Sequence, residues 1–317
     1  MKKVVICGVW HVHAPDYYNY AHDLVDIIGV YDEDPIKLAA FCEKFPVKPF
    51  ASFEELLASG ADGAIVCIST ESHADVMVAL ANAKMDIFTE KVLGLTTAEC
   101  ERVEEAVNRN GVKFVISFPR RYSAGALTVK KIVDSGVLGK INYFRYHASH
   151  NGSCDNWLPA HFYNRKECGG GAMIDHGAHG MYLVEWFCGM PDAAYSAFTV
   201  ACEREDALAL NPDRVEDNSV TVMTYKNGCI AINESGFVST GYPATIEVCG
   251  EKGRVLFDNQ KVYIADKSKV LKEVELEEAQ PIPIIQFCTG NILEGCGMAE
   301  AKKLTKIMEM AYANFIS

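Results

Sequence analysis

A carboxylate and an imidazole, Asp175 and His179, follow a run of three glycines at 169–171. Oxidising an alcohol requires a base at the hydroxyl, and histidine suits this role because its pKa lies near neutrality. On one helix the two residues are four positions apart, so they share a face and can touch. His176 points about 100° away on such a helix and is a weaker candidate. The pair predicts acid–base chemistry; the alternative is a structural helix start at Asp175.

The amino terminus has features of a dinucleotide-binding unit. An apolar run at 4–7 predicts a strand, and Gly8 follows it where a glycine turn would meet a pyrophosphate at the start of a helix. Asp32 lies 24 positions after Gly8 at the end of a second apolar run, where a carboxylate would bind ribose hydroxyls. Glu33 would repel a 2′-phosphate, so we expect NAD rather than NADP. The alternative is that Asp32 only opens a turn before Pro35.

The glycine fingerprint is incomplete. Its second and third glycine positions hold Trp10 and His13, and the second glycine normally lets the backbone approach the phosphates. The sequence leaves open whether Trp10 blocks a dinucleotide. We expect Gly8, Trp10, His11 and Val12 to contact the cofactor, and one hypothesis is that the imidazoles of His11 and His13 replace glycine backbone contacts.

Strand and helix patterns alternate through the first 120 residues. Apolar strands that are buried on both faces and separated by helices predict a parallel sheet with helices on each side. We expect strands at 4–7, 26–31, 64–68, 86–89 and 113–117, and helices near 17–24, 35–45, 52–55, 72–83 and 96–110.

The alternation of predicted strands and helices ends after residue 120. We expect helices at 126–135 and from the glycine run to about 187, and a last helix at 300–315 that packs back on the body. Short strands with hairpin turns such as Asn227-Gly228 predict a mostly antiparallel sheet with helices on one side, an α+β domain. The expected strands are 140–150, 196–202, 220–225, 230–235, 245–249, 254–258 and 261–265. With 317 residues, two domains are expected, 1–120 and 121–317, with the last helix packed back on the first domain.

Further motifs complete a family pattern. They are Thr70-Glu71-Ser72-His73, Glu90-Lys91 and the segment from Gly169 to His179. In this order they resemble the Gfo/Idh/MocA family of NAD(P)-dependent oxidoreductases over essentially the whole chain. The chain keeps Thr70, His73, Glu90, Lys91 and the family's Gly-Gly-Gly-x-x-x-Asp-x-Gly-x-His motif. It departs at Glu71 and Ser72, at Val92 in place of a proline, and in the glycine fingerprint.

The resemblance implies an amino-terminal Rossmann domain that binds NAD, followed by an open-faced sheet domain that covers the nicotinamide. It implies that Lys91 assists at the substrate hydroxyl, that His179 is the acid–base residue, and that Asp175 orients it or binds a substrate hydroxyl. The substrate would be a sugar, inositol or related polyol. Thr70, His73, Glu90 and Lys91 would contact the cofactor, and Arg120, Arg121, Trp157, His161, Tyr163 and His176 would line the substrate pocket.

Lys91 also has an alternative interpretation. A lysine after a strand is commonly a solvated charge, and its adjacency to Glu90 would then form an exposed ion pair of little energetic value. In a desolvated pocket the same ammonium would polarise a substrate oxygen.

Composition limits the partners. A net charge of −12 and a pI of about 5.3 disfavour nucleic acid and anionic membranes, which attract clustered Lys and Arg. The start of the chain lacks a signal-peptide pattern and no apolar run reaches membrane length, and the 12 cysteines form no CxxC motif. We expect a cytoplasmic protein with reduced thiols. An open sheet face predicts a homodimer or homotetramer that covers it.

Two other functions stay open. His11-Val12-His13, with Asp16 and His22 nearby, has the spacing of metal-dependent hydrolases built on barrels, although the second half supplies no further βα units. A non-catalytic NAD-binding sensor or regulatory protein would also explain an eroded fingerprint. The favoured interpretation places no metal among the site residues.

Overall fold

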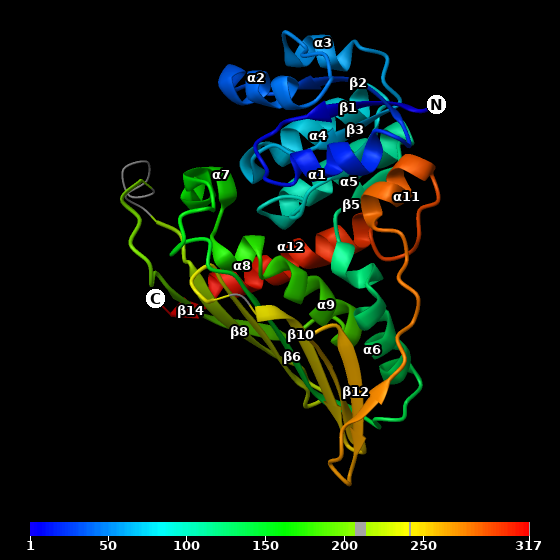
Figure 1. The fold of residues 1–317 in the computed structure, drawn as a ribbon, viewed down its shortest axis with the longest axis vertical. Helices are drawn as coiled ribbons and strands as arrows, with labels where there is room; N and C mark the ends of the chain where they lie inside the picture. Colours follow the sequence, from blue (N-terminus) through cyan, green and yellow to red (C-terminus); the bar gives the residue numbers. More distant parts are fainter. Residues whose placement is uncertain (207–213, 241, 317) are drawn as a thin grey trace. The chain divides into compact units, whose positions relative to one another are not determined.

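The computed structural model describes residues 1–206, 214–240 and 242–316 (Figure 1). It divides into two compact units, Met1–Phe118 with Pro281–Thr305, and Pro119–Gln280 with Lys306–Ser317. The sequence division at residue 120 left the segment 281–305 in the second domain, whereas this segment packs within the first unit. There Phe287 contacts Phe88 with ring centroids 5.9 Å apart. Long-range contacts of this kind carry no local sequence signal.

The first unit is built on a five-stranded parallel sheet in the order β2-β1-β3-β4-β5. The strand order reverses between β1 and β3, and ligands of such sheets bind outside the carboxyl ends of the strands at this switch point. The interior is apolar, as Val4, Val5 and Ile65 have no exposed surface. The strands are β1 (Lys3–Cys7), β2 (Asp26–Tyr31), β3 (Gly63–Val66), β4 (Asp86–Thr89) and β5 (Phe114–Ile116).

Helices connect these strands as predicted. Ser52 caps α3 through the Glu55 amide, and Thr96 forms a capping box with Glu99 at the start of α5. The α5 helix ends at Gly111, which has a φ of 65°. The helices of the unit are α1 (Ala14–Ala21), α2 (Pro35–Lys44), α3 (Phe53–Leu57), α4 (His73–Asn82), α5 (Thr97–Asn110) and α11 (Pro283–Thr289), with the 3₁₀ turn η1 (Thr70–Ser72).

The second unit is built on a nine-stranded sheet in the order β13-β12-β11-β10-β6-β9-β8-β7-β14. All neighbouring pairs are antiparallel except β6 with β9 and β7 with β14, which confirms the predicted α+β class. The strands are β6 (Ile141–Ser149), β7 (Ala193–Thr199), β8 (Asn218–Thr224), β9 (Ile230–Gly236), β10 (Tyr242–Gly250), β11 (Gly253–Asp258), β12 (Lys261–Asp266), β13 (Lys272–Val274) and β14 (Phe315–Ile316).

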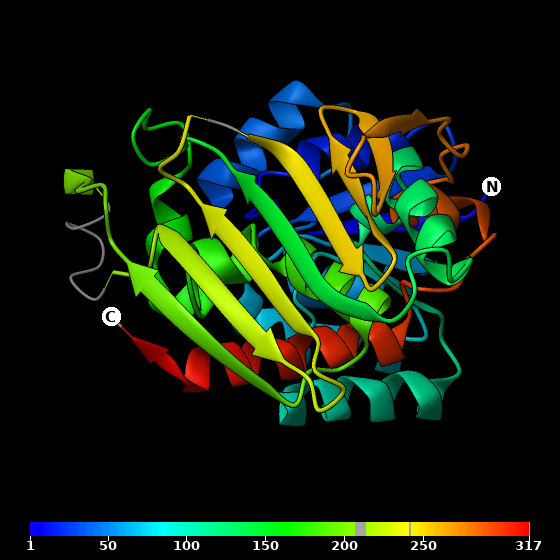
Figure 2. The ribbon, with the colours of Figure 1, turned by 90° about the horizontal axis from the view of Figure 1, so that it is seen from below.

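Helices cover one face of this sheet. The α9 helix packs against β6 and β9, α8 against β8 and β9, and α6 against β11 and β12. Figure 2 looks onto the opposite face, where Tyr195 of β7 is 58% exposed while its neighbours Ala194 and Ser196 are buried. The helices are α6 (Ala124–Asp134), α7 (Arg165–Cys168), α8 (Ala172–Asp175), α9 (Ala178–Cys188) and α12 (Met298–Ala313, in this unit from Lys306), with the 3₁₀ turns η2 (Pro119–Tyr122) and η3 (Ala160–Tyr163).

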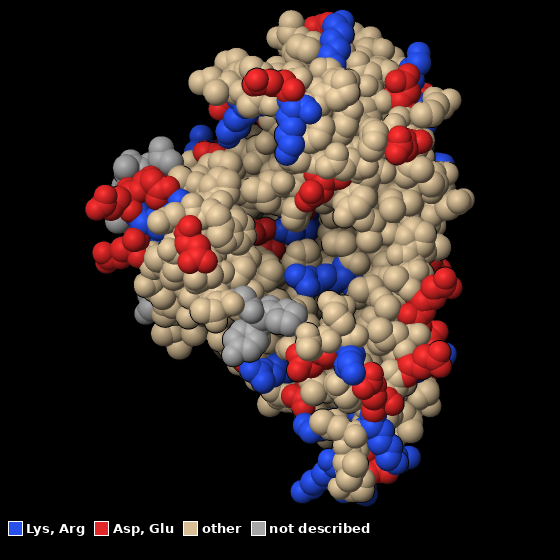
Figure 3. Space-filling view, viewed as in Figure 1, with Lys and Arg blue, Asp and Glu red and all other residues tan. Residues whose placement is uncertain are grey.

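Surface charges of both signs are interspersed on the face drawn in Figure 3, with no continuous basic stripe over it. Such a stripe is the usual footprint of nucleic-acid binding. None of the helices in the described part of the chain combines the length and apolarity that crossing a membrane requires.

Candidate active site

The turn after β1 depends on Gly8. Its φ of +88° lies in the region that glycine favours, and a Cβ at this position would come within 2.3 Å of the Ile68 Cγ2 and 2.8 Å of the Ile68 nitrogen. Its amide donates to the Tyr31 carbonyl at 2.7 Å. The backbone therefore passes directly against the segment after β3, so this glycine meets both a conformational and a packing requirement.

Replacing Gly8 with alanine should destabilise the first unit. The left-handed backbone costs a non-glycine residue about 1–2 kcal/mol, and forcing a methyl group into filled space costs about 1–3 kcal/mol more. Gly111 is the matched control, because its φ is +65° and nothing lies within 4 Å of the position that an added methyl group would take. Urea unfolding should show a larger loss for Gly8→Ala than for Gly111→Ala, and equal losses would contradict the packing argument.

Asp32 stands at the end of β2, beside the Gly8 turn. Its Oδ2 accepts from the Val9 amide at 2.6 Å and its Oδ1 from the Asp34 amide at 2.8 Å. The cap of α2 is a different residue, since Asp34 accepts from the Ile36 and Lys37 amides. Asp32 therefore does more than open the turn before Pro35, and it lies where a ribose-binding carboxylate is expected.

A buried carboxylate ties the β1–α1 segment to the end of β4. Glu90 is 1% exposed, and its Oε1 lies 2.7 Å from the His13 Nδ1 and 3.9 Å from the His11 Nδ1. The Tyr17 hydroxyl donates to the same oxygen, and the Lys91 amide donates to Oε2 at 3.0 Å. Burial alone would raise the pKa of Glu90, but the charges of His11 and His13 and the hydrogen bond from His13 outweigh it and hold the pKa well below its usual range.

Lys91 follows Glu90 and is 5% exposed, so neither residue of the expected exposed pair is in solvent. The solvated-charge interpretation of Lys91 is therefore wrong. The peptide bond from Lys91 to Val92 is cis, at the position where the family has a proline.

His73 joins two loops of the first unit. Its Nδ1 lies 2.7 Å from the Val92 carbonyl and its Nε2 3.3 Å from the Ile68 carbonyl. Burial lowers the pKa of His73, against the opposing effect of the Val92 and Ile68 carbonyls. These contacts favour a role in positioning the segment after β4 over direct cofactor contact. Thr70, on the η1 turn just before, is half-buried.

The glycine run of the second unit is packed against two residues that local patterns did not indicate. A Cβ on Gly170 would lie 2.1 Å from the Tyr312 hydroxyl, and one on Gly171 only 1.9 Å from the Glu216 carbonyl oxygen. The Glu216 Oε1 accepts from the amides of Gly171 and Met173 at 3.0 and 3.1 Å and from the Tyr312 hydroxyl at 2.6 Å. Glu216 thus fixes the start of α8, and the glycines allow this close approach.

Burial raises the pKa of Glu216 above its ordinary value, against the opposing effect of its hydrogen bonds from Tyr312, Met173 and Gly171. Between the ordinary and the raised pKa the folded state binds more protons than the unfolded state, so the stability contributed by Glu216 falls as pH rises through that window. Glu216→Gln keeps an acceptor and removes this titration.

The stability of Glu216→Gln relative to wild type should therefore increase from about pH 4.5, the unperturbed glutamate range, and level off at higher pH. Urea unfolding from pH 4 to 8 measures this difference. A difference that stays constant over the range would show that Glu216 does not titrate as described.

Asp175 and His179 lie on two different helices. Asp175 ends α8, and α9 starts at Ala178. The predicted helix is therefore divided in two, although the linking residues His176 and Gly177 keep right-handed helical backbone angles. A Cβ on Gly177 would lie 2.5 Å from the Met173 carbonyl. The His179 Nδ1 lies 3.0 Å from the Tyr182 hydroxyl, one turn along α9.

Tyr182 positions the His179 ring. Its hydroxyl also accepts from the Arg120 amide at 3.1 Å, so the oxygen is held from two sides. His179 is 8% exposed. Its ring is thereby fixed in a largely dry setting that suits an acid–base residue.

Three imidazoles gather in the second unit, those of His150, His176 and His179. The ring centroids of His150 and His176 lie 5.1 Å apart, and those of His176 and His179 lie 6.0 Å apart. His150 stacks on Phe237 at 4.8 Å and contacts Trp157 at 4.7 Å. Sequence reasoning missed His150, which ends a strand pattern without any motif. Trp157 is 55% exposed and borders this cluster.

The other predicted pocket residues have different surroundings. Arg121 stacks over Trp186 at 4.8 Å, and His161 is half-buried on η3. Tyr163 has no exposed surface, and its hydroxyl bonds to Ser153. Its ring lies under the guanidinium groups of Arg204 and Arg214, at 5.0 and 5.5 Å. These contacts favour a packing role for Tyr163 over the predicted substrate contact.

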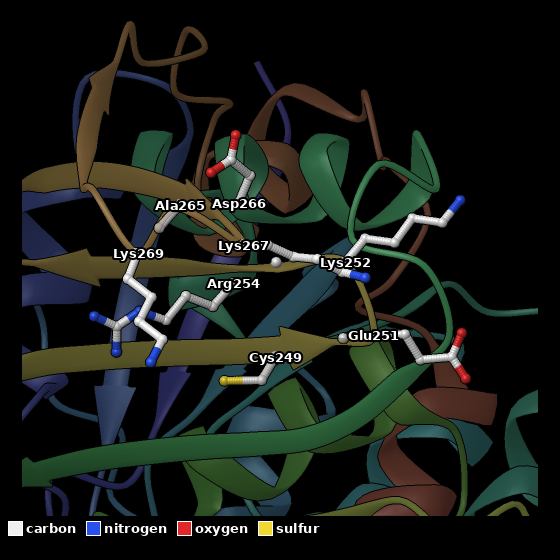
Figure 4. Close-up of a pocket in the computed structure, with 10 residues that line it drawn as sticks. Cys249, Glu251, Lys252, Arg254, Ala265, Asp266, Lys267 and Lys269 are labelled. Carbon is white, nitrogen blue, oxygen red and sulfur yellow. The ribbon is translucent and has the colours of Figure 1, made fainter.

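A basic hollow of about 510 Å³ lies at the turns joining β10 to β11 and following β12 (Figure 4). Its lining contains none of the functional residues that the sequence predicted, so we do not place the substrate there. The lining residues are Cys249, Gly250, Glu251, Lys252, Gly253, Arg254, Ala265, Asp266, Lys267 and Lys269.

Comparison with known families now identifies the chain. Residues 2–118 match the sequence model described as the oxidoreductase family, NAD-binding Rossmann fold, and residues 126–256 match the GFO/IDH/MocA C-terminal domain. The chain belongs to the Gfo/Idh/MocA family. This confirms the predicted family, fold class and oxidoreductase type, and NAD as the class of cofactor.

Proteins similar to this chain include inositol dehydrogenases and a levoglucosan dehydrogenase. The chain is 30% identical to the myo-inositol 2-dehydrogenase of Thermotoga maritima over 200 residues, 62% of this chain and 57% of the relative. It is 29% identical to the inositol 2-dehydrogenase of Salmonella typhimurium over 262 residues, 79% of this chain and 72% of the relative. The fold also resembles a levoglucosan dehydrogenase solved with NADH, with a TM-score of 0.81 at 16% identity over 98% of this chain and 96% of the other.

Proposed function

We propose that this Gfo/Idh/MocA protein moves a hydride between NAD and a secondary hydroxyl or ketone of a sugar, inositol or related polyol. The observation that carries the proposal is the buried His179 of the second unit, whose ring is held by Tyr182. The first unit of the same chain matches the family's NAD-binding Rossmann fold. The aligned relatives that oxidise inositols support this substrate class.

The first unit fits a dinucleotide despite the missing glycines. Gly8 leaves no side chain at the turn where backbone must approach a phosphate, and Asp32 stands at the end of the neighbouring strand. Gly8, Trp10, His11 and Val12 would hold the pyrophosphate side and Asp32 the adenosine ribose. Glu33 is exposed beside Asp32, which favours NAD over NADP. When bound, NAD⁺ supplies the hydride acceptor.

In the oxidative direction His179 accepts the proton of the substrate hydroxyl while the carbon loses its hydride and becomes a ketone. Tyr182 contacts Nδ1 and holds the ring for this exchange, and Asp175 orients the substrate or the ring. Lys91, buried after β4, stabilises the developing negative charge on the substrate oxygen.

Formation of NADH, followed by absorbance with a panel of inositols, hexoses and hexonic acids, tests the reaction. We expect at least one inositol or sugar to reduce NAD⁺ with saturation. Tight NAD⁺ binding without turnover over the whole panel would favour a sensor or regulatory protein instead. The hydrolase alternative needs a barrel, and the five-stranded open sheet of the first unit does not provide one.

We further infer a homodimer or homotetramer in the cytoplasm. The open face of the nine-stranded sheet exposes Tyr195, Val220 and Ile230 by 58, 38 and 43%, and a second copy of the same face would cover them. None of the 12 cysteines, all of which lie in the described residues, forms a disulfide, which suits a reducing compartment. A monomer by light scattering would contradict the oligomer.

A further inference from the structure

Three side chains that commonly bind metals converge in the first unit. His11 and His13 lie in the segment after β1, and Glu90 follows β4. One potential ligand atom from each of the three lies within 4.8 Å of the other two. His11 and Glu90 are buried and the His13 side chain is 40% exposed.

We propose that His11, His13 and Glu90 bind one divalent transition-metal ion. Two imidazole nitrogens and one carboxylate oxygen form the ligand set of catalytic zinc and of non-haem ferrous sites. Three protein ligands leave at least one coordination position for water or a ligand oxygen. This inference departs from the sequence expectation of no metal, and it does not depend on which substrate the enzyme oxidises.

The distances require only small movements. Two ligand atoms of a tetrahedral zinc ion, each about 2.0–2.2 Å from the metal, lie about 3.4 Å apart, and the His11 Nδ1 is 3.9 Å from the Glu90 Oε1. The His13 Nδ1 is 2.7 Å from that oxygen and would move outward by about 0.7 Å. His13 can make this adjustment because its side chain is partly in solvent.

Surrounding groups hold the three ligands in place. The Tyr17 hydroxyl and the Lys91 amide orient the two oxygens of Glu90, and Tyr17 is itself bonded to Ser117 at 2.7 Å. The His13 amide donates to the His11 Nδ1 at 3.2 Å, so an ion on Nδ1 would replace this contact and an ion on Nε2 would keep it. Partners of this kind orient ligands in metal sites.

The cluster lies at the ligand-binding edge of the sheet. The His11 amide donates to the Cys67 carbonyl just after β3 at 3.0 Å, which places the His11 backbone at the switch point between β1 and β3. A ligand oxygen that reaches this edge can occupy the open coordination position.

Zinc retention and cobalt spectroscopy test the site directly. Full-length wild-type protein, loaded with Zn²⁺ and passed through gel filtration, should retain one equivalent by elemental analysis. Co²⁺ should give visible absorption bands at one equivalent. His13→Ala, whose side chain is partly exposed, should bind at least 10–100-fold more weakly, the loss that removal of an outer partner alone produces.

His22 provides the matched control, since it is an exposed histidine just after α1 in the same unit. His22→Ala should retain zinc and the cobalt bands as wild type does. Circular dichroism and thermal unfolding establish that each variant folds. No stoichiometric metal in wild type, or full retention in His13→Ala, would overturn the proposal and leave the three residues as a hydrogen-bond network.

Discussion

Replacing His179 with alanine should lower kcat for polyol oxidation by about 10²–10⁴-fold, the usual contribution of general acid–base catalysis. The dissociation constant for NAD⁺ should stay within about twofold, because His179 lies in the second unit and the residues proposed to hold the dinucleotide lie in the first. Stopped-flow or steady-state absorbance of NADH gives the rate, and calorimetric titration gives the affinity.

His176→Ala is the comparison for this variant. It removes an imidazole of the same cluster whose ring centroid is 6.0 Å from that of His179, and its effect on kcat should be much smaller. Tyr182→Phe should lie between the two, since it removes the hydroxyl that positions the His179 ring. An equal loss of turnover and NAD⁺ affinity in His179→Ala would indicate that His179 is only structural.

Replacing Gly171 with alanine should destabilise the second unit by about 1–3 kcal/mol or more, because overpacking a filled interior costs this amount. The added methyl carbon would lie 1.9 Å from the Glu216 carbonyl oxygen, and a backbone atom cannot rotate away as a flexible side chain can. Since Glu216 fixes the start of α8, the change should also displace Asp175 and lower kcat. Urea unfolding and initial rates measure the two effects.

Gly297→Ala is the matched control for Gly171→Ala. Its φ is not positive, and the nearest atom to an added methyl group is a Glu300 carboxylate oxygen at 3.4 Å. Its stability should change by less than about 0.5 kcal/mol. If Gly171→Ala unfolds at the same urea concentration as Gly297→Ala, the packing account of the glycine run is wrong.

Local patterns were sufficient for the strands and connecting helices of residues 1–118 in the first unit, but did not predict α11. Continuous apolar runs such as Val4–Ile6 have no exposed surface in the parallel sheet, and capping residues Ser52 and Thr96 start helices where the sequence predicted them. The Gly8 turn and Asp32 also lie together as expected, because residues after adjacent parallel strands meet at one edge.

Contacts between residues that are distant along the chain could not be predicted from the sequence. Glu216 and Tyr312 contact the glycine run from distant parts of the chain, and nothing near either residue marks this role. The division between α8 and α9 at His176 and Gly177 is likewise not marked in the sequence. A helical period of 3.6 residues fits both one long helix and two short ones.

The convergence of His11, His13 and Glu90 could be predicted only in part from the sequence. The His-x-His pattern was visible in the sequence, and Glu90 was noted through its motif with Lys91. Their proximity required the strand order β1-β3-β4, which brings the segments after β1 and β4 to one edge. Each motif was therefore predictable, and their combination was not.

Calorimetric titration of the protein with NAD⁺ and NADP⁺ tests the central claim most directly. The claim is that Gly8 and Asp32 hold NAD although Trp10 and His13 replace two fingerprint glycines. We expect micromolar binding of NAD⁺ and much weaker binding of NADP⁺. Binding of neither would contradict an NAD-dependent function for this chain.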